Sequence, residues 1–212
     1  MLELKAKHGL EFFSVGGGVG IVYRGALASG DVAWWTGSGE ETAERITPEE
    51  YASEVIGPLK ELGLRILFEP GRFIVGNAGV LLTTVLYRKE TPTKKFVVVD
   101  AGMNDLIRPA LYEGHHEIEP LRQPENTATE KVDVVGPVCE SGDFFAQDRE
   151  VPPLAPGDRI ALMSAGAYGF VMSSTYNARP LLPEVLVEGT KSTVVRARQT
   201  WEDLIRGEVV PS

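Results

Sequence analysis

The chain has almost no cysteine and no long hydrophobic run. Cys139 is the single cysteine among 212 residues, which excludes an internal disulfide. No stretch approaches the roughly 20 consecutive apolar residues that a membrane-spanning helix needs. No apolar leader precedes the first charges, Glu3 and Lys5. We therefore expect a cytoplasmic protein with no membrane partner.

Basic charge is scarce as well. The chain carries 30 acidic residues against 21 lysines and arginines, for a formal net charge of −9. The basic residues form no cluster that would match a phosphate backbone. Nucleic acid is therefore not an expected partner, and the hydrophobic content of 43% fits a folded protein of one or two domains.

The first 75 residues predict a strand, a loop, a helix and a second strand. Residues 12–15 form a short apolar strand that runs directly into the glycines of residues 16–20. Thr47-Pro48-Glu49-Glu50 predicts the start of a helix with a capping box, and Gly57-Pro58 should kink or split that helix. Residues 64–68 form the second strand. This order predicts one parallel βαβ crossover.

After residue 75 the pattern changes to β-branched runs separated by glycine, proline and charged turns. The predicted strands cover residues 79–87, 96–100, 132–138, 159–164 and 185–187. This pattern predicts an antiparallel β domain. We place the domain boundary near Gly76, so that residues 1–75 form an α/β piece and residues 76–212 the β domain.

Three short motifs each allow a binding or a structural interpretation. Glycines after a strand let backbone amides approach a phosphate, but a plain glycine-rich turn fits equally well. Glu69-Pro70-Gly71-Arg72 places a carboxylate and a guanidinium within one turn, either as a site or as a structural ion pair. Arg108 and Tyr112, four residues apart, are either a binding pair or a solvated edge.

Cys139 and Glu140 are a stronger candidate. A lone thiol beside a carboxylate, at the end of a strand and just after Gly136-Pro137, is better explained as a positioned acid or nucleophile than as packing.

Two histidines and two tryptophans are interpreted as structural. His115 and His116 point to opposite faces of an extended chain, and no further ligand stands at a recognisable spacing, so we predict loop residues and no metal site. Trp34 and Trp35 lie in an irregular loop over residues 25–46 and are expected to pack against the α/β piece.

Six motifs follow one another in a fixed order along the chain. They are Gly16-Gly17-Gly18-Val19-Gly20, Glu69-Pro70-Gly71-Arg72, Asp100-Ala101-Gly102-Met103-Asn104-Asp105, Arg108-Pro109-Ala110-Leu111-Tyr112, Cys139-Glu140-Ser141-Gly142-Asp143 and Gly166-Ala167-Tyr168-Gly169. This order resembles the diaminopimelate decarboxylases, which are pyridoxal-phosphate enzymes with an alanine-racemase-like (β/α)8 barrel and a β domain. The resemblance implies that residues 1–75 are the last two β/α units of that barrel, with a phosphate-binding loop, and that residues 76–212 are an antiparallel, barrel-like β domain.

The resemblance also implies how pyridoxal phosphate is bound. Gly16, Gly17 and Gly18 would hold the cofactor phosphate, and Glu69, Pro70, Gly71 and Arg72 would complete the cradle. The Glu69 carboxylate would keep the pyridine nitrogen protonated, so that the ring accepts the electrons released when carbon dioxide leaves. Tyr168 would contact both cofactor and substrate.

The implied substrate is meso-diaminopimelate, which is decarboxylated to L-lysine. Arg72, Arg108 and Tyr112 would bind its distal amino-acid end, because a guanidinium fork suits a carboxylate. Glu140 would accept the distal ammonium, and Cys139 would return a proton to the carbanionic carbon. Relatives that act on ornithine or lysine are expected to carry an aspartate after the cysteine, so Glu140 favours diaminopimelate.

The chain departs from the family on its amino-terminal side. The lysine that forms the Schiff base, and a histidine that stacks on the cofactor ring, belong to an earlier part of the barrel, and no lysine here stands in a matching context. We expect a carboxy-terminal portion of a decarboxylase, inactive in isolation, and a homodimer in which the cysteine loop reaches the neighbouring subunit's site. Two alternatives are a non-catalytic binding or regulatory relative and a decarboxylase of the same fold that acts on arginine or a polyamine precursor.

Overall fold

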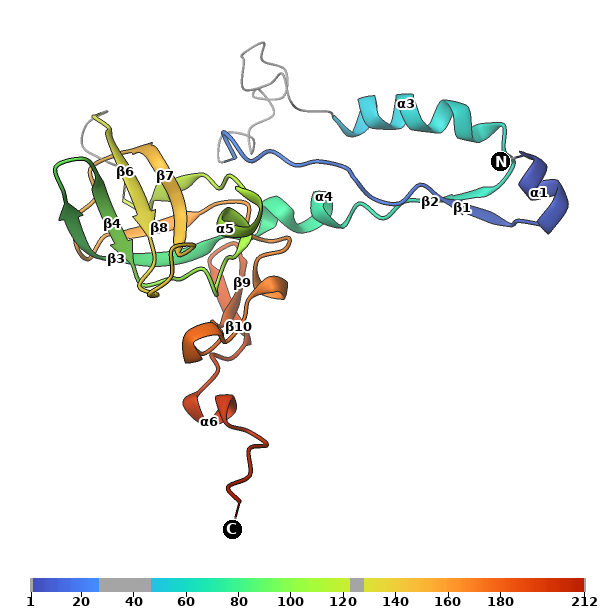
Figure 1. Cartoon of the computed structure of the whole chain (residues 1–212). Coiled ribbons are helices and arrows are strands. Elements are labelled where there is room, and N and C mark those ends of the chain that lie inside the picture. Colours follow the sequence, from blue (N-terminus) through green and yellow to red (C-terminus); the bar gives the residue numbers. More distant parts are fainter. Residues whose placement is uncertain (1, 27–46, 123–127, 212) are drawn as a thin grey trace.

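The computed structural model describes residues 2–26, 47–122 and 128–211. In Figure 1 a β-rich body carries two projections, an extended amino-terminal arm and a carboxy-terminal tail. Within the described residues no helix is both long enough and apolar enough to cross a membrane. The predicted packing of Trp34 and Trp35 lies outside these residues.

The arm contains a parallel pair of short strands joined through a helix. Its elements are α1 (Leu2–His8), β1 (Phe12–Ser14), α3 (Pro48–Lys60) and β2 (Arg65–Leu67). β1 and β2 pair in parallel, with Phe12 opposite Arg65. This confirms the predicted strand, helix, strand order and its parallel pairing.

Helix α3 begins where the capping box predicts. The Thr47 hydroxyl accepts the Glu50 amide at 3.1 Å, and the Glu50 carboxylate accepts the Thr47 amide at 2.8 Å. The helix is not split at Gly57-Pro58, contrary to one of the two expected outcomes. Pro58 lies in the last turn, where its missing N–H removes a single intrahelical hydrogen bond.

Apolar side chains of the arm are left exposed. No residue of α3 is buried, and Phe12 and Phe68 are 52% and 38% exposed. Strands of a parallel sheet are ordinarily covered on both faces by neighbouring elements. The exposed apolar surface of the arm therefore resembles a sheet surface that is normally covered by further strands and helices.

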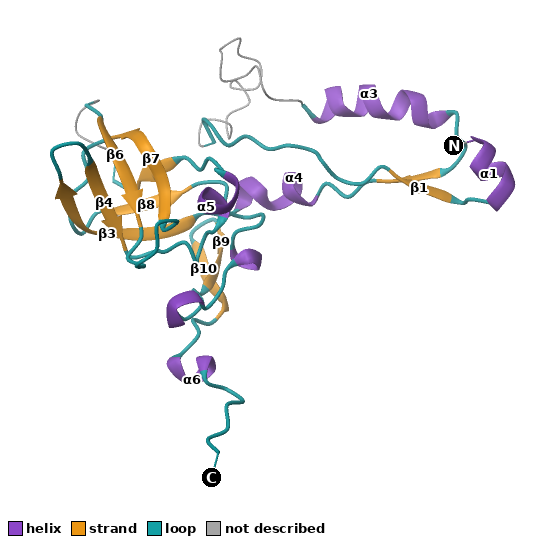
Figure 2. Ribbon diagram, viewed as in Figure 1, coloured by secondary structure: helices purple, strands orange, loops and turns teal. Residues whose placement is uncertain are grey.

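The body is a nearly closed, barrel-like sheet, shown in Figure 2. Its strands, in spatial order β5-β8-β3-β4-β6-β7, are β5 (Ile118–Pro120), β8 (Arg159–Leu162), β3 (Leu81–Glu90), β4 (Lys95–Val99), β6 (Glu130–Val135) and β7 (Phe144–Val151). The sheet is mixed rather than antiparallel throughout, because β4 and β6 run parallel with Phe96 opposite Asp133. The connection between β4 and β6 includes α5 (Arg108–Tyr112) and β5. This connection brings the chain back to the end of the sheet at which β4 begins, so that β6 can run parallel to β4.

Aliphatic side chains, mostly valines from neighbouring strands, fill the barrel. Ten of the residues in this core are at most 2% exposed: Val85, Val97, Val99, Leu106, Val132, Val134, Phe145, Val151, Ile160 and Leu162. Each side chain of this size contributes roughly 1.5–3 kcal/mol by leaving water. The core therefore lies inside the sheet and not between the sheet and the arm.

Three strands are absent from the sequence prediction. They are β5, β7 and β10 (Lys191–Arg196), the last of which pairs with β9 (Glu184–Glu188) in a hairpin whose turn holds Gly189 at φ +59°. The tail also carries the short turns η4 (Phe170–Met172) and η5 (Tyr176–Ala178) and the helix α6 (Trp201–Leu204). The hairpin is largely exposed, unlike the strands of the barrel.

A close approach between backbones joins the arm to the barrel. The segment α4 (Gly71–Val75) and η3 (Gly76–Ala78) leads into β3 and lies against the loop that follows β8. The Gly166 amide donates to the Gly76 carbonyl at 3.0 Å, and the Ala165 amide donates to the Gly79 carbonyl at 2.7 Å. A Cβ on Gly166 would lie 1.9 Å from the Val75 carbonyl oxygen, so no larger residue fits there without displacing the backbone.

We predict that Gly166→Ala destabilises the protein by about 1–3 kcal/mol, the usual cost of overpacking, because α4 and the loop after β8 must move apart. The measurement is the thermal unfolding midpoint of the full chain. Gly20→Ala is the matched control, since a Cβ there would meet no atom within 4 Å. Equal midpoints for the two variants would contradict this view of the junction.

Candidate active site

The glycine loop after β1 needs glycine for its shape. Gly16 and Gly18 have φ of +78° and +87°, which favour glycine. A Cβ on Gly17 would lie 2.7 Å from the Glu69 carbonyl oxygen. The Gly16 carbonyl also accepts the Glu69 amide at 2.9 Å. The structure therefore brings together two motifs that are about fifty residues apart in sequence.

The Glu69 carboxylate is exposed and is held by a hydroxyl rather than by a cation. Ser14 donates to Glu69 Oε1 at 2.5 Å, and the Gly16 amide donates to Ser14 Oγ at 3.1 Å. No ion pair joins Glu69 to a basic side chain within the described part of the chain. The structural ion pair with Arg72, which the sequence leaves open, is therefore not formed.

Arg72 instead meets the loop after β8. Its guanidinium carbon lies 5.4 Å from the centre of the Tyr168 ring. Tyr168 has φ +58° and is 45% exposed, so a strained backbone presents this phenol at the surface. We call Ser14, residues 16–18, Glu69, Arg72 and Tyr168 the glycine-loop cluster.

This cluster fits a phosphorylated pyridine cofactor. The loop offers backbone amides without side-chain hindrance, and Glu69 offers a carboxylate that pairs with no cation in the part of the chain that the structure describes. Pro70 and Gly71 form the turn that enters α4, where the Gly71 amide donates to the Glu69 carbonyl at 2.8 Å. The residues that the sequence assigns to the cofactor therefore lie next to one another.

Three lysines with side-chain contacts lie away from the glycine-loop cluster. Lys5 Nζ donates to the Leu62 carbonyl at 2.8 Å, whereas Lys94 pairs with Asp133 at 2.6 Å and Lys95 with Glu130 at 3.1 Å. These side chains serve the arm and the surface of the barrel. They do not supply an amine to the glycine-loop cluster.

Cys139 and Glu140 stand exposed in the connection between β6 and β7, which we call the cysteine loop (residues 136–143). The strand predicted for residues 132–138 ends earlier, at Val135. The buried Asp143 carboxylate shapes the loop, because it accepts the amides of Met103 at 2.6 Å and Val138 at 2.5 Å. Burial raises the pKa of Asp143, while these two hydrogen bonds oppose the rise.

A tyrosine absent from the sequence prediction completes the cysteine loop. The Tyr176 hydroxyl donates to Glu140 Oε2 at 3.3 Å. The segment around Tyr176 is anchored by Arg179, which donates to Asn104 Oδ1 at 2.9 Å and lies 3.5 Å from Asp105 Oδ2. The motif over residues 100–105 therefore has a structural role, because it fixes both the cysteine loop and the segment that carries Tyr176.

Helix α5 lies beside the cysteine loop and carries Arg108 and Tyr112. A Cβ on Gly142 would lie 3.7 Å from the Ala110 methyl, which shows how close the helix and the loop are. Tyr112 is 63% exposed, whereas Arg108 is only 7% exposed and is not the solvated edge that the sequence also allowed. Arg108 Nη1 lies 2.9 Å from His116 Nε2.

The interpretation of His116 as an ordinary loop residue is incomplete. It does lie in the connection between α5 and β5, but its side chain is fully buried. Its role depends on partners that are distant in sequence, Met163 and Tyr23, so spacing gave no signal for it. Within residues 2–26, 47–122 and 128–211 no cluster of three His, Cys, Asp or Glu side chains is arranged to hold a metal ion.

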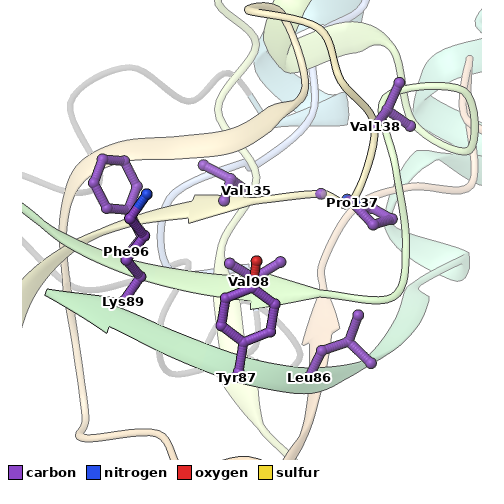
Figure 3. Close-up of a pocket in the computed structure, with 9 residues that line it drawn as sticks. Leu86, Tyr87, Lys89, Phe96, Val98, Val135, Pro137 and Val138 are labelled. Carbon is purple, nitrogen blue, oxygen red and sulfur yellow. The ribbon is translucent and has the colours of Figure 1, made fainter.

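The two groups of predicted site residues remain separate within one chain. No hydrogen bond or ion pair between described residues joins the glycine-loop cluster to Cys139 or Glu140. A shallow pocket of about 350 Å³ opens on the outer face of β3, β4 and β6 (Figure 3). Its lining is mainly apolar and contains none of the predicted site residues, although Val138 at its edge precedes Cys139.

Comparison with known proteins gives consistent matches. The family model "Pyridoxal-dependent decarboxylase, C-terminal sheet domain" matches residues 21–166. The chain is 43% identical over 204 residues to a diaminopimelate decarboxylase of Zymomonas mobilis, covering 96% of this chain and 44% of the relative. It is 46% identical over 209 residues to that of Methanothermobacter thermautotrophicus, covering 95% and 45%.

Comparison with a solved structure also finds a diaminopimelate decarboxylase. The diaminopimelate decarboxylase of Helicobacter pylori, complexed with L-lysine, superposes with a TM-score of 0.80 at 43% identity, covering 96% of this chain and 46% of that one. The chain thus spans less than half the length of the relatives it matches. A match over most of the chain, together with this superposition, places the chain in the family of pyridoxal-dependent decarboxylases, to whose C-terminal sheet domain it corresponds.

Proposed function

We propose that this chain forms the carboxy-terminal half of a pyridoxal-phosphate-dependent decarboxylase that converts meso-diaminopimelate to L-lysine. The observation that carries the proposal is a buried arginine that pairs with no carboxylate of the described residues. Arg108 is 7% exposed, and no acidic side chain pairs with it in the described part of the chain. A buried guanidinium is costly unless an anion compensates it, so Arg108 suits the carboxylate of a ligand.

The distal end of diaminopimelate is complementary in charge to the predicted substrate-binding side chains. It is an amino acid, with one carboxylate and one ammonium. Arg108 and Arg72 supply guanidinium groups, Tyr112 supplies an exposed hydroxyl four residues after Arg108, and Glu140 supplies the carboxylate for the ammonium. An amine-only substrate would leave the arginines without a partner, which disfavours a polyamine precursor.

The cofactor, when bound, supplies an electron sink for the carbon that loses carbon dioxide. Gly17 and Gly18 would offer amides to its phosphate, Gly16, whose amide donates to Ser14 Oγ, would give the loop its turn, and Glu69, oriented by Ser14, would hold a proton on the ring nitrogen. Tyr168 and Arg72, which contact each other, would lie beside the bound cofactor. Cys139 would return a proton to the reacting carbon after carbon dioxide has left.

The cysteine loop acts on the site of a second subunit in this proposal. The lack of any hydrogen bond or ion pair between the glycine-loop cluster and Cys139 or Glu140, among the described residues, supports a homodimer. We place the domain boundary at residues 75/76, between the partial barrel and the β domain, and we place the enzyme in the cytoplasm. The lysine contacts described above support the view that the isolated chain lacks covalent attachment of the cofactor.

We predict that Cys139→Ala, in a complete enzyme made by joining the amino-terminal half of a relative to this chain, lowers turnover at least about 100-fold, the typical worth of a general acid. The absorbance of the bound cofactor should be unchanged, because Cys139 does not hold the cofactor. The control is Gln147→Ala, an exposed position on the following strand. Unchanged turnover of Cys139→Ala would remove this residue as the proton donor.

Glu140→Gln tests the choice of substrate in the same complete enzyme. Loss of a charge-assisted hydrogen bond is worth about 1.5–3 kcal/mol. We therefore expect KM for meso-diaminopimelate to rise roughly 10- to 100-fold, with a smaller change in kcat, because Glu140 binds the end that does not react. A silent substitution would instead favour a decarboxylase of arginine or a polyamine precursor.

A further inference from the structure

The buried Arg108 guanidinium differs from other arginines of the chain in its hydrogen-bond partner. Arg88 and Arg179 lie close to carboxylates, at Glu130 and Asp105 respectively. Arg108 is more buried than either and has a neutral ring as its hydrogen-bond partner. Among the described residues, no carboxylate therefore takes up its remaining N–H groups.

The hydrogen bonds of His116 fix which nitrogen carries its proton. His116 Nδ1 lies 2.7 Å from the Met163 carbonyl oxygen, which only accepts, so Nδ1 must be the donor. Arg108 Nη1 only donates, so His116 Nε2 must be the acceptor at 2.9 Å. Both contacts are satisfied together in the neutral ring with its proton on Nδ1, and not in the imidazolium.

The surroundings of His116 keep the ring neutral. Burial is the main cause that lowers the pKa of His116 to about 4, and the nearby positive charges lower it further. The hydrogen bond to the Met163 carbonyl acts in the opposite direction. The titratable groups that face it are Arg108 of α5, Arg149 of β7 and the adjacent His115, and Arg149 Nη1 donates to the His116 carbonyl at 2.9 Å. The edge of the Tyr23 ring also meets it, at 5.9 Å between centroids.

Tyr23 holds the guanidinium from another side. The Arg108 guanidinium carbon lies 4.9 Å from the centre of the Tyr23 ring. The segment that carries Tyr23 is fixed on both sides of it: the Val22 carbonyl accepts Asn77 Nδ2 of η3 at 2.8 Å, and the Gly25 amide donates to Glu117 Oε2, just before β5, at 2.9 Å. Arg108 is thus held between a fixed ring face and a fixed acceptor.

We propose that His116 is a positioning residue: as a neutral acceptor it orients Arg108, with Tyr23 as the supporting face, so that the free N–H groups of Arg108 meet the distal carboxylate of the substrate. What Arg108 binds rests on the proposed function. The orientation of Arg108 by His116 does not, since it follows from the contacts of this chain alone.

The first test uses the full chain without cofactor or substrate. Nitrogen-15 NMR of its imidazole rings is expected to show one histidine, removed by His116→Gln, that remains neutral with its proton on Nδ1 from pH 7 down to about pH 5, well above the value to which burial lowers the pKa. A proton on Nε2, or titration near the ordinary pKa of about 6.5, would overturn the proposal whatever the enzyme does.

The second test uses the complete enzyme and separates positioning from folding. His116→Leu removes the acceptor, whereas His116→Gln keeps an oxygen that can accept from Arg108. We expect His116→Leu to raise KM for meso-diaminopimelate about tenfold or more with kcat nearly kept, and His116→Gln to recover most of that loss. Should His116→Leu not fold, Tyr23→Leu is the substitute, with a smaller rise in KM as the expected result.

The outcomes of the second test are distinguishable from failure of the proposed function. An unsubstituted complete enzyme that does not decarboxylate meso-diaminopimelate refutes the proposed function, and the NMR result then decides the role of His116. Equal loss of kcat in both His116 variants with unchanged KM would contradict positioning of a substrate-binding arginine.

Discussion

The close backbone contact between Gly166 and the Val75–Gly79 segment is the constraint on which the other features depend. It sets the arm against the barrel without any intervening side chain at Gly166. Because Arg72 precedes this segment and Tyr168 follows Gly166, the same contact brings the guanidinium and the phenol together. Asn77 and Ser164, from the two sides of the junction, both donate to the Val22 carbonyl and so fix the segment that carries Tyr23.

The distribution of paired and unpaired charges separates structural residues from candidate site residues. Arg88 and Lys94, on the barrel, pair with carboxylates, as does Arg179 in the tail. Glu69 and Arg108, by contrast, are held by a serine hydroxyl and a neutral histidine among the described residues. Neutral partners orient a charge without neutralising it, which leaves the charge available to a ligand. This difference is the physical link between the fold of the chain and its proposed chemistry.

Local signals in the sequence predicted local structure well. The capping box of α3 needs only Thr47 and Glu50, three residues apart, and it formed as expected. Strand β7 was missed because Asp148, at φ +49°, interrupts its alternation and because charged residues follow. The parallel pairing of β4 with β6 was missed because it depends on where a long connection returns, which no short window contains. For the same reason the burial of His116 and the contact of Tyr176 with Glu140 had no precursor in the spacing of residues.

We propose that this chain is one part of a decarboxylase and that it gains activity when an amino-terminal barrel half supplies the reactive lysine. The most direct measurement is the visible absorbance of the chain with pyridoxal phosphate, before and after borohydride reduction, together with carbon dioxide release from meso-diaminopimelate. The chain should show neither attachment that survives borohydride nor turnover by itself, and should show turnover when the amino-terminal half of a relative is added. Attachment and turnover by the chain alone, or no turnover from the two halves together, would contradict the account.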